Sequence, residues 1–357
     1  MPYGASTAGD STRVLSLKDN GYDLVRLVLA AAVVYSHSYA LGGFGPEPLR
    51  QFSKEDLFVG KLAVLGFFGL SGFLVAASFE RSRGLVDFFS KRVRRILPGY
   101  WVCLAVSAFV IAPLIWVAGG RQVSSFPWWG AESAAAFVAS NFLLRIHQWN
   151  VAGVLEGQVL TSSLNGSLWS LYPEFLCYVG LAALGFAGAM RASRWLLLIL
   201  LFAVMGYHII DIERATEPSF PAIPAICALT GWTVFFAAFA VGLCAYVWRE
   251  SIRFDWRTLL LLLAVALLSA RLGGFEYLSP VLVPALVLVG GGCFTLRLRA
   301  DLSYGIYIYS FPLQLLIGAS GVAAGSVVVF FILSLVASSL AAWLSWTFVE
   351  QPSLHRS

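Results

Sequence analysis

Two ionisable residues in an otherwise apolar stretch near the N-terminus have a spacing that suits chemistry. Arg26 and His37 are eleven residues apart, which places them about 20° apart on one face of a helix and about 16 Å apart along its axis. Asp23 comes three residues before Arg26 and can pair with it. Charges inside a bilayer are costly unless they pair or do chemistry. The spacing therefore favours a cation that binds a ligand and an imidazole that acts as general base or nucleophile. The alternative is that Arg26 reaches the lipid headgroups and that His37 is an interfacial residue.

A second basic motif contains Arg92 and Arg95, just before a predicted helix that has Pro98 in its first turn. Residues at positions i and i+3 share a helical face, and two guanidinium groups on one face can bind a phosphate bidentately. The alternatives are an ordinary cluster of cytoplasmic positive charges or a patch for lipid headgroups.

Two further segments carry polar groups into predicted helices. Glu174 could polarise a histidine or accept a proton, or it could form a structural ion pair. Trp169, five residues before it, could support the site or belong to an aromatic belt. The hydroxyl groups of Ser303, Tyr304 and Tyr307 suggest a polar cavity, with hydrogen bonding between helices as the alternative.

Other motifs do not indicate chemistry. The four histidines lack the spacing of metal ligands, so we expect no metal site. The segment around Ser71 is no nucleophile elbow, because it lacks the second elbow glycine. The five cysteines lie in or beside apolar runs and are expected to be buried free thiols.

The composition indicates a membrane protein. Of 357 residues, 59% are hydrophobic and 12% are charged, whereas ordinary soluble domains have about 25% charged residues. This excludes a soluble enzyme, a disordered chain and a disulfide scaffold. The net charge of +5 does not indicate a nucleic-acid partner, because the basic residues gather in loops predicted to face the cytoplasm. We expect an all-α, polytopic integral membrane protein.

About ten transmembrane helices are predicted, and placing both termini in the cytoplasm puts most of the 24 Lys and Arg residues on that side. The short segment 133–146 is expected to be interfacial or re-entrant. We expect a cytoplasmic N-terminal tail (1–20), one membrane domain (21–350) whose first helix is an uncleaved anchor, and a cytoplasmic tail (351–357). The apolar runs are 24–41, 57–79, 97–118, 168–190, 194–210, 222–247, 258–272, 278–295, 302–319 and 322–347.

Taken in order, these motifs resemble the membrane acyltransferase-3 family along nearly the whole chain. Many members carry an acidic residue where this chain has Leu65 and a histidine where it has Ser310, so the donor or acceptor preference can differ. The residues that match the family motifs are Asp23, Arg26 and His37; Phe67, Phe68, Ser71, Gly72, Phe73 and Leu74; Arg92, Arg95, Ile96 and Pro98; Trp169, Ser170, Leu171 and Glu174; Ser303, Tyr304 and Tyr307; and Phe348, Glu350 and Pro352.

The resemblance implies transfer of an acyl group, by default acetyl, from cytoplasmic acyl-CoA to a hydroxyl of an extracytoplasmic or lipid-linked glycan. It implies a location in the bacterial cytoplasmic (inner) membrane and no permanently bound cofactor. His37 would be general base or acyl carrier, and Glu174 would orient it. The remaining implied residues are Arg26, Arg92 and Arg95 for the donor phosphates, and Asp23, Ser71, Trp169, Ser303, Tyr304 and Tyr307 in support.

Three questions stay open at this point. Aromatic residues of the predicted outer loop could stack on sugar rings or anchor the loop at the interface; they are Phe126, Trp128, Trp129 and Trp149. A transporter of a glycan or small acid would also suit intramembrane Arg, His and Glu. A structural membrane scaffold would make Arg26 and His37 dispensable.

Overall fold

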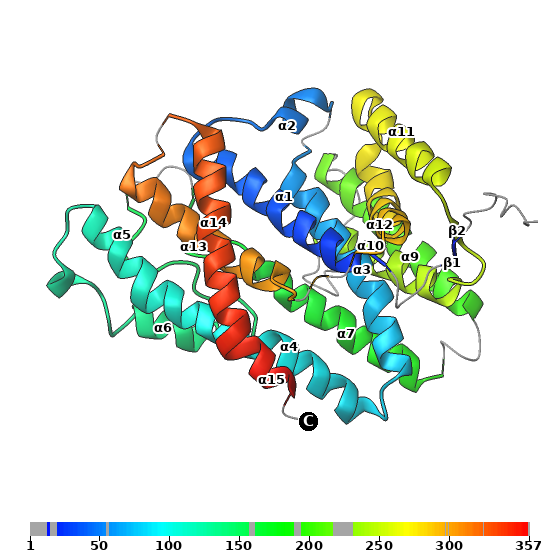
Figure 1. The fold of residues 1–357 in the computed structure, drawn as a ribbon, viewed down its shortest axis with the longest axis horizontal. Coiled ribbons are helices and arrows are strands. Elements are labelled where there is room, and N and C mark those ends of the chain that lie inside the picture. The colour runs from blue at the N-terminus through cyan, green and yellow to red at the C-terminus, as the bar shows by residue number, and fades with distance from the viewer. Residues whose placement is uncertain are drawn as a thin grey trace, which may run out of the picture.

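The computed structural model is a bundle of helices (Figure 1). The described residues are 13–14, 20–54, 57–156, 161–188, 194–216, 231–296, 298, 300–323 and 325–355. The longer helices among them are α1 (Tyr22–Gly42), α3 (Val59–Glu80), α4 (Leu85–Val106), α7 (Leu171–Phe186), α9 (Arg194–Thr216), α10 (Thr233–Val247), α11 (Trp256–Leu272), α12 (Phe275–Cys293), α13 (Ser303–Ser320) and α14 (Val327–Ser345).

Short elements complete the described chain. Two-residue strands β1 (Arg13–Val14) and β2 (Arg253–Phe254) pair in antiparallel fashion. The short helices are α2 (Pro48–Phe52), α5 (Ala112–Ala118), α6 (Ala134–Ser140) and α15 (Gln351–His355), with π turns at Ser107–Ile111 and Trp346–Glu350 and 3₁₀ turns at Val123–Ser125 and Leu168–Ser170.

Seven helical stretches in the described chain are long and apolar enough to cross a membrane. The helix α10 is apolar but has only 15 residues, and residues 222–230 of the predicted run lie outside the described residues. The count of about ten and the placement of the termini stay predictions. The seven stretches are Tyr22–Gly42, Val59–Glu80, Leu85–Ala118, Leu168–Phe186, Arg194–Glu213, Phe275–Cys293 and Val327–Leu354.

Three predicted boundaries differ from the structure or reach beyond it. The helix predicted over 97–118 begins at Leu85, so Pro98 lies in its interior rather than in its first turn. The first turns of this helix carry several charged residues, so the apolar run in the sequence begins later than the helix does. The segment 133–146 contains only the seven-residue α6, which is too short to cross a bilayer, as predicted. Most of the predicted tail 1–20 lies outside the described residues.

The helix α3 occupies the centre of the bundle, between α1, α10 and α12. It approaches α10 without intervening side chains: a Cβ atom on Gly72 would overlap the main-chain oxygen of Phe239, and one on Gly242 would overlap that of Gly69. Small residues at such a crossing allow two backbones to pack directly, as in other membrane helices.

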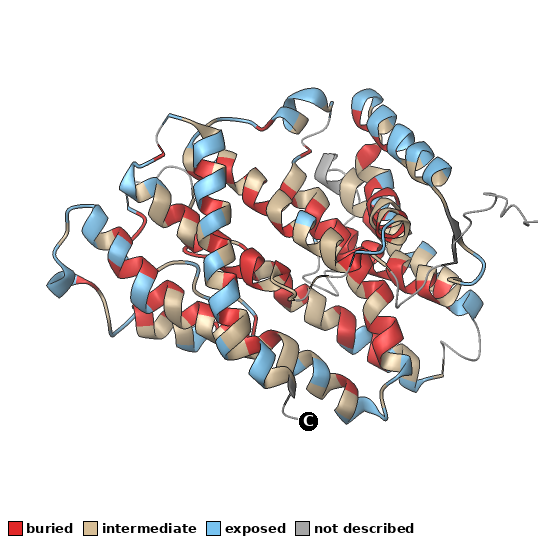
Figure 2. Ribbon diagram, viewed as in Figure 1, coloured by how far each residue is buried: buried red, intermediate tan, exposed pale blue. Residues whose placement is uncertain are grey.

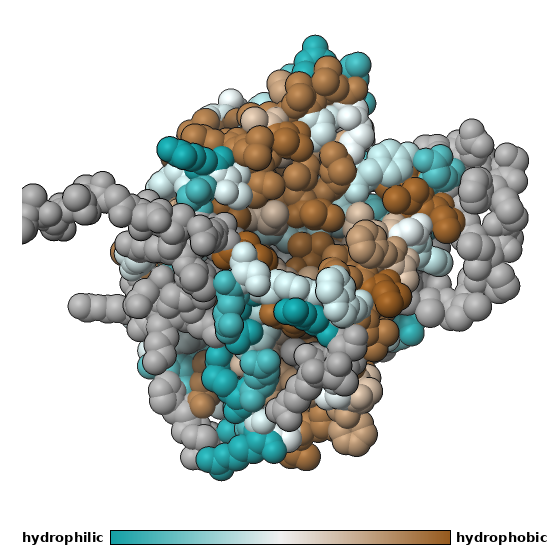
Figure 3. Space-filling view, turned by 90° about the vertical axis from the view of Figure 1, so that its right-hand side faces the viewer, coloured by the Kyte–Doolittle hydropathy of each residue, from teal (hydrophilic) through white to brown (hydrophobic). Residues whose placement is uncertain are grey.

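The outer surface carries apolar side chains. Along α11 and α14 many residues are exposed (Figure 2), and a broad hydrophobic patch covers the upper part of the face in Figure 3. Leu261 on α11 is 65% exposed and Val328 on α14 is 60% exposed. Apolar surface of this extent is expected where lipid chains, not water, cover the protein.

Candidate functional site

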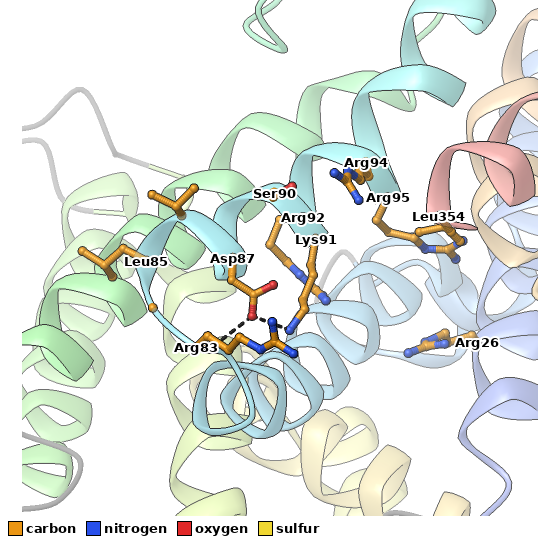
Figure 4. A pocket seen from close by; sticks show the side chains of 12 residues that line it. Arg26, Arg83, Leu85, Asp87, Ser90, Lys91, Arg92, Arg94, Arg95 and Leu354 are labelled. Atoms are coloured by element: carbon orange, nitrogen blue, oxygen red, sulfur yellow. Dashed lines mark hydrogen bonds and ion pairs between the residues drawn. The ribbon is translucent and has the colours of Figure 1, made fainter. Parts of the chain in front are cut away.

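A cavity of about 1080 Å³ opens beside the first turns of α4, with Arg26 of α1 and Leu354 of α15 on its other side (Figure 4). We call it the basic cavity because six of its lining side chains are cationic and one is acidic. Arg26 and Arg95 lie close together at one side of the view, whereas Lys91 pairs with Asp87 at 2.8 Å. The cationic lining residues are Arg26, Arg83, Lys91, Arg92, Arg94 and Arg95.

The structure brings together the three arginines that the sequence assigned to donor binding. Arg26 and Arg95 share one carboxylate: their Nη atoms lie 3.0 Å and 2.6 Å from Oδ2 of Asp301. Arg26 also contacts Asp23 at 3.3 Å, which is the i,i+3 pair that the spacing predicted. Arg92 donates to Ser78 Oγ at 3.2 Å, and its Nε atom is buried without a partner in the described part of the chain. A cationic face with unused donor capacity suits an anionic ligand.

Asp301 is a site residue that the sequence analysis missed. Its Oδ1 accepts hydrogen bonds from the main chain and hydroxyl of Ser303, so it forms an Asx-turn just before α13 as well as pairing with the arginines. Burial alone would raise the pKa of Asp301, but Arg95 and Arg26 outweigh it and lower the pKa. An acidic residue two positions before a helix-starting serine was an available signal.

Glu350 is the second acidic residue of this network. From the sequence, Glu350 was assigned only to the closing family motif. In the structure its Oε2 lies 3.4 Å from Arg95, and the side chain is 2% exposed. Ser345 donates to the other carboxylate oxygen at 3.0 Å. The last helical segment of the chain is therefore tied to the basic cavity.

A narrower cavity of about 140 Å³ shares Arg26, Arg92 and Arg95 with the basic cavity and continues between α3, α7 and α13. We call it the inner cavity. Of the predicted site residues it contains Ser71, Glu174, Ser303, Tyr304 and Tyr307. The two cavities together therefore gather most of the residues that the sequence singled out.

Hydrogen bonds hold the polar groups of the inner cavity in place. Oε1 of Glu174 accepts hydrogen bonds from Ser71 Oγ at 2.8 Å and Tyr178 OH at 2.5 Å. The hydroxyls of Ser170 and Tyr307 are 2.6 Å apart. Tyr304 donates to the main-chain oxygen of Ile96 at 2.8 Å, which fixes α13 to α4. Tyr178 came from none of the sequence motifs.

His37 lies beyond the inner cavity. Its ring meets Phe311 edge to face, with 5.0 Å between centroids, and Phe311 is four residues beyond the cavity-lining Tyr307 on α13. Nδ1 of His37 is buried and lacks a hydrogen-bond partner within the described residues. The expected contact with Glu174 is not among the hydrogen bonds there, because Glu174 is oriented toward Ser71 and Tyr178.

Other buried polar atoms without partners lie close to His37 along the chain or in space. Gln314, three residues after Phe311, donates to Val34 O at 2.9 Å and to Ser38 Oγ at 3.0 Å. Its Oε1 atom has no partner among the described residues, and neither does Oγ of the buried Ser167. Buried polar atoms left unpaired cost free energy, so this region is ready to accept hydrogen bonds from a ligand or water.

Trp169 lies apart from the other supporting residues. It meets Phe235 edge to face at 5.2 Å and lines a different cavity near the start of α3. Its neighbour Ser170 lines the inner cavity. Trp169 and Ser170 therefore line different cavities, because adjacent residues in a 3₁₀ turn face different helices, and the supporting role of Trp169 stays a prediction.

The structure places Ser310, which departs from the family pattern, and the aromatic residues of the predicted outer loop. Ser310 is fully buried and donates to Tyr307 O at 3.2 Å. Phe126 and Trp128 pack edge to face at 4.6 Å, so packing accounts for these two rings. Trp129 is 80% exposed and Trp149 is 44% exposed, and a role of these two in sugar stacking stays a prediction.

The described residues contain no cluster of metal ligands, and their cysteines are free thiols. No group of three or more His, Cys, Asp or Glu side chains there is placed to hold a metal ion. Cys103, Cys177, Cys244 and Cys293 are free, as predicted, although Cys293 is only partly buried. Cys227 lies outside the described residues.

Comparison with known proteins agrees with the motif assignment. The model of the acyltransferase-3 family, which is described as an acyltransferase domain, matches residues 19–347. An O-acetyl transferase of Shigella phage Sf6 is 28% identical over 95% of this chain and 97% of its own length. Nodulation protein 10 of Rhizobium leguminosarum bv. viciae is 27% identical over 97% of this chain and 96% of its own length. No solved structure matches the chain significantly. This protein therefore belongs to the acyltransferase-3 family and is a membrane O-acyltransferase.

Proposed function

We propose that the protein transfers an acyl group, with acetyl as the expected group, from acyl-CoA to a hydroxyl of a glycan or lipid-linked saccharide. The observation that carries this proposal is that Arg26, Arg92 and Arg95 line both the basic cavity and the inner cavity. The order of groups in acyl-CoA matches the order of the two cavities. Its phosphates are at one end, and an uncharged arm extends from them to the thioester at the other end.

The basic cavity supports the phosphate end of this assignment. Its volume of about 1080 Å³ is at the upper end of small-molecule sites, and its lining is strongly cationic. Phosphate oxygens would compete with Asp301 for Arg26 and Arg95, which can each present two donors to an anion. Positive charge also favours the cytoplasmic side of a membrane, which supports a cytoplasmic donor and a location in the bacterial cytoplasmic membrane.

The inner cavity supports the path of the uncharged arm. It is narrow and leads from the arginines to Tyr307, one helical turn from the Phe311 ring that touches His37. Arg26 and His37 are separated by about 16 Å along α1 on the rise of an ideal helix. A donor gripped by its phosphates near Arg26 can therefore extend its thioester toward His37.

His37 would act on the acceptor hydroxyl in one of two ways. As general base, it takes the hydroxyl proton while the oxygen attacks the thioester carbonyl, the C–S bond breaks, and the CoA thiolate recovers the proton. As acyl carrier, the imidazole attacks the thioester carbonyl and the C–S bond breaks to release CoA thiolate. The hydroxyl oxygen then attacks the acyl-imidazole, the C–N bond breaks, and the thiolate takes up the hydroxyl proton. Glu174, held by Ser71 and Tyr178, would position the thioester end of the donor arm from the inner cavity.

The test uses membranes that contain the wild-type protein or His37→Ala, labelled acetyl-CoA and a glycan acceptor fraction. Label should move to the glycan with wild type and not with the variant. Val28→Ala is the matched control, because Val28 is on the same helix and is 58% exposed; it should transfer as wild type does. A well-folded His37→Ala protein with full transfer would refute the scheme.

A further inference from the structure

A second polar cavity, of about 600 Å³, lies at the opposite end of α3 from the basic cavity. We call it the outer polar cavity because it lies beside the first turn of α3, at the end of the helix that is predicted to face the outside. Its lining combines side chains from α3, α9, α10 and α12 with the turn before α7. The polar and aromatic members that matter here are Lys61, Trp169, His208, Asp211, Thr233 and Glu276.

The polar groups of the outer polar cavity are already held in fixed positions. Lys61 Nζ lies 3.0 Å from Oε1 of Glu276, and Thr233 donates to Oδ2 of Asp211 at 3.0 Å. The His208 ring lies between the two groups, with Nε2 at 3.3 Å from the main-chain oxygen of Glu276 and Nδ1 at 3.4 Å from Thr233 Oγ1. Such a preorganised lining suits recognition of a polar ligand.

The position of this cavity relates it to the reaction path. Lys61 is in the first turn of α3, and the basic cavity begins just past Glu80, where α3 ends. A helix of 22 residues is about 33 Å long, close to the thickness of a bilayer core. Val64 lines both the outer polar cavity and the inner cavity. The inner cavity is therefore bordered at one end by the basic cavity and at the other by the outer polar cavity.

The charges of the lining restrict the class of ligand. One lysine faces two carboxylates, and that lysine is already paired with Glu276. A phosphate or a sugar acid would meet Asp211, which has hydrogen bonds from Thr233 and the main chain of Gly231 but no cationic partner within the described residues, and like charges in a partly buried site repel. An uncharged polyhydroxyl compound meets carboxylate and imidazole groups that bind hydroxyls, and the Trp169 ring can pack against the apolar C–H face of a sugar ring.

Resting on the proposed function, we infer that the outer polar cavity binds a saccharide unit of the acceptor, and that this unit is a neutral or amino sugar rather than a sugar acid. Asp211 sets the preference by charge, and Trp169 provides the stacking surface. The acceptor would then approach from the end of α3 opposite to the donor.

The test measures sugar binding directly with the full-length protein in lipid nanodiscs. The probes are methyl glucoside, methyl glucosaminide and methyl glucuronide, which share one ring and differ in a single substituent. Saturation-transfer NMR would report their binding to wild type, Trp169→Leu and Asp211→Asn. Trp343→Leu is the matched control for the tryptophan, because Trp343 is 52% exposed on α14. Calorimetric binding of acetyl-CoA is measured for each protein in parallel.

We expect wild type to bind the glucoside and the glucosaminide about tenfold more tightly than the glucuronide. Trp169→Leu should weaken all sugar binding about tenfold, and Asp211→Asn should weaken the glucoside while removing most of the discrimination against the glucuronide, as the loss of one hydrogen bond to a charged group predicts. Acetyl-CoA binding should stay within twofold of wild type in each variant, which also shows that the variants are folded.

The inference is overturned if wild type binds none of the three sugars, if it prefers the glucuronide, or if both variants keep wild-type sugar binding. Failure of the proposed function has a different signature: wild type would then fail to bind acetyl-CoA, whatever the sugars do.

Discussion

The two ends of α3 differ in how their charges are balanced. The basic cavity has six cationic lining side chains and one carboxylate, and Arg92 keeps a buried donor without a partner within the described residues. At the other end, Lys61 is paired with Glu276 and Asp211 accepts from Thr233. An excess of cationic side chains attracts a polyanion, whereas a lining with one lysine and two carboxylates favours neutral hydroxyls over anions. The difference shows how one bundle can separate two substrates by charge.

The largest effect is expected at His37, the residue proposed to act on the acceptor hydroxyl. His37→Ala should lower the rate of transfer by roughly 10²- to 10⁴-fold, the usual contribution of a positioned acid–base group. Binding of acetyl-CoA and of sugar should both persist, because neither end of α3 is altered. Calorimetry for the donor and NMR for the sugar check this. Simultaneous loss of both binding activities would instead assign His37 a structural role.

The next effect concerns only the basic end. Arg92→Gln should raise the KM for acetyl-CoA about 10- to 100-fold, which corresponds to one lost hydrogen bond between charged partners, and should leave the acceptor KM unchanged. Steady-state kinetics with each substrate varied in turn measure both constants. Arg249→Gln is the control, since Arg249 pairs with Glu250 and lines neither the basic nor the inner cavity. An equal rise in both KM values would contradict the separation of the two sites.

The two ends should also differ in what their carboxylates contribute to stability. Asp301→Asn should lower the free energy of unfolding by about 2 kcal/mol, because it leaves two part-buried arginines with less compensation. Glu276→Gln should cost less than about 1 kcal/mol, because the side chain is 39% exposed. Thermal unfolding of both variants in nanodiscs gives the comparison. Equal losses would mean that Asp301 is no more central than a surface partner.

The smallest effect is that of salt. Raising the salt concentration should raise the donor KM about two- to fivefold, because screening weakens the attraction of phosphates to the open basic cavity. The KM for a neutral acceptor sugar should change little, because it carries no charge to be screened. Kinetics at two ionic strengths, with a neutral osmolyte as control, provide the measurement. A salt-independent donor KM would argue against phosphate binding in this cavity.

Much of the local structure could be predicted from the sequence because it depends on neighbouring residues. Where the structure describes them, the apolar runs are largely helical, and the Asp23–Arg26 pair formed as its i,i+3 spacing predicted. The start of the helix containing Arg92 was placed too late, because its first turns are amphipathic and charged rather than apolar.

The site was only partly predictable, because periodicity assigns residues to a face of one helix but not to the helix that packs against that face. Arg26 and Arg95 meet at Asp301 across 206 to 275 positions of the chain, and no local pattern contains this information. For the same reason Glu174 was expected beside His37, whereas it contacts Ser71 and Tyr178.

The direct backbone contact between α3 and α10 has a consequence for how the enzyme can diversify. A side chain at Gly72 or Gly242 would displace α3, and α3 carries Lys61 of the outer polar cavity as well as Ser71 of the inner cavity. A single change there would disturb both cavities at once. New acceptor or donor preferences would therefore have to arise on the facing helices, with the central pair kept as an invariant axis.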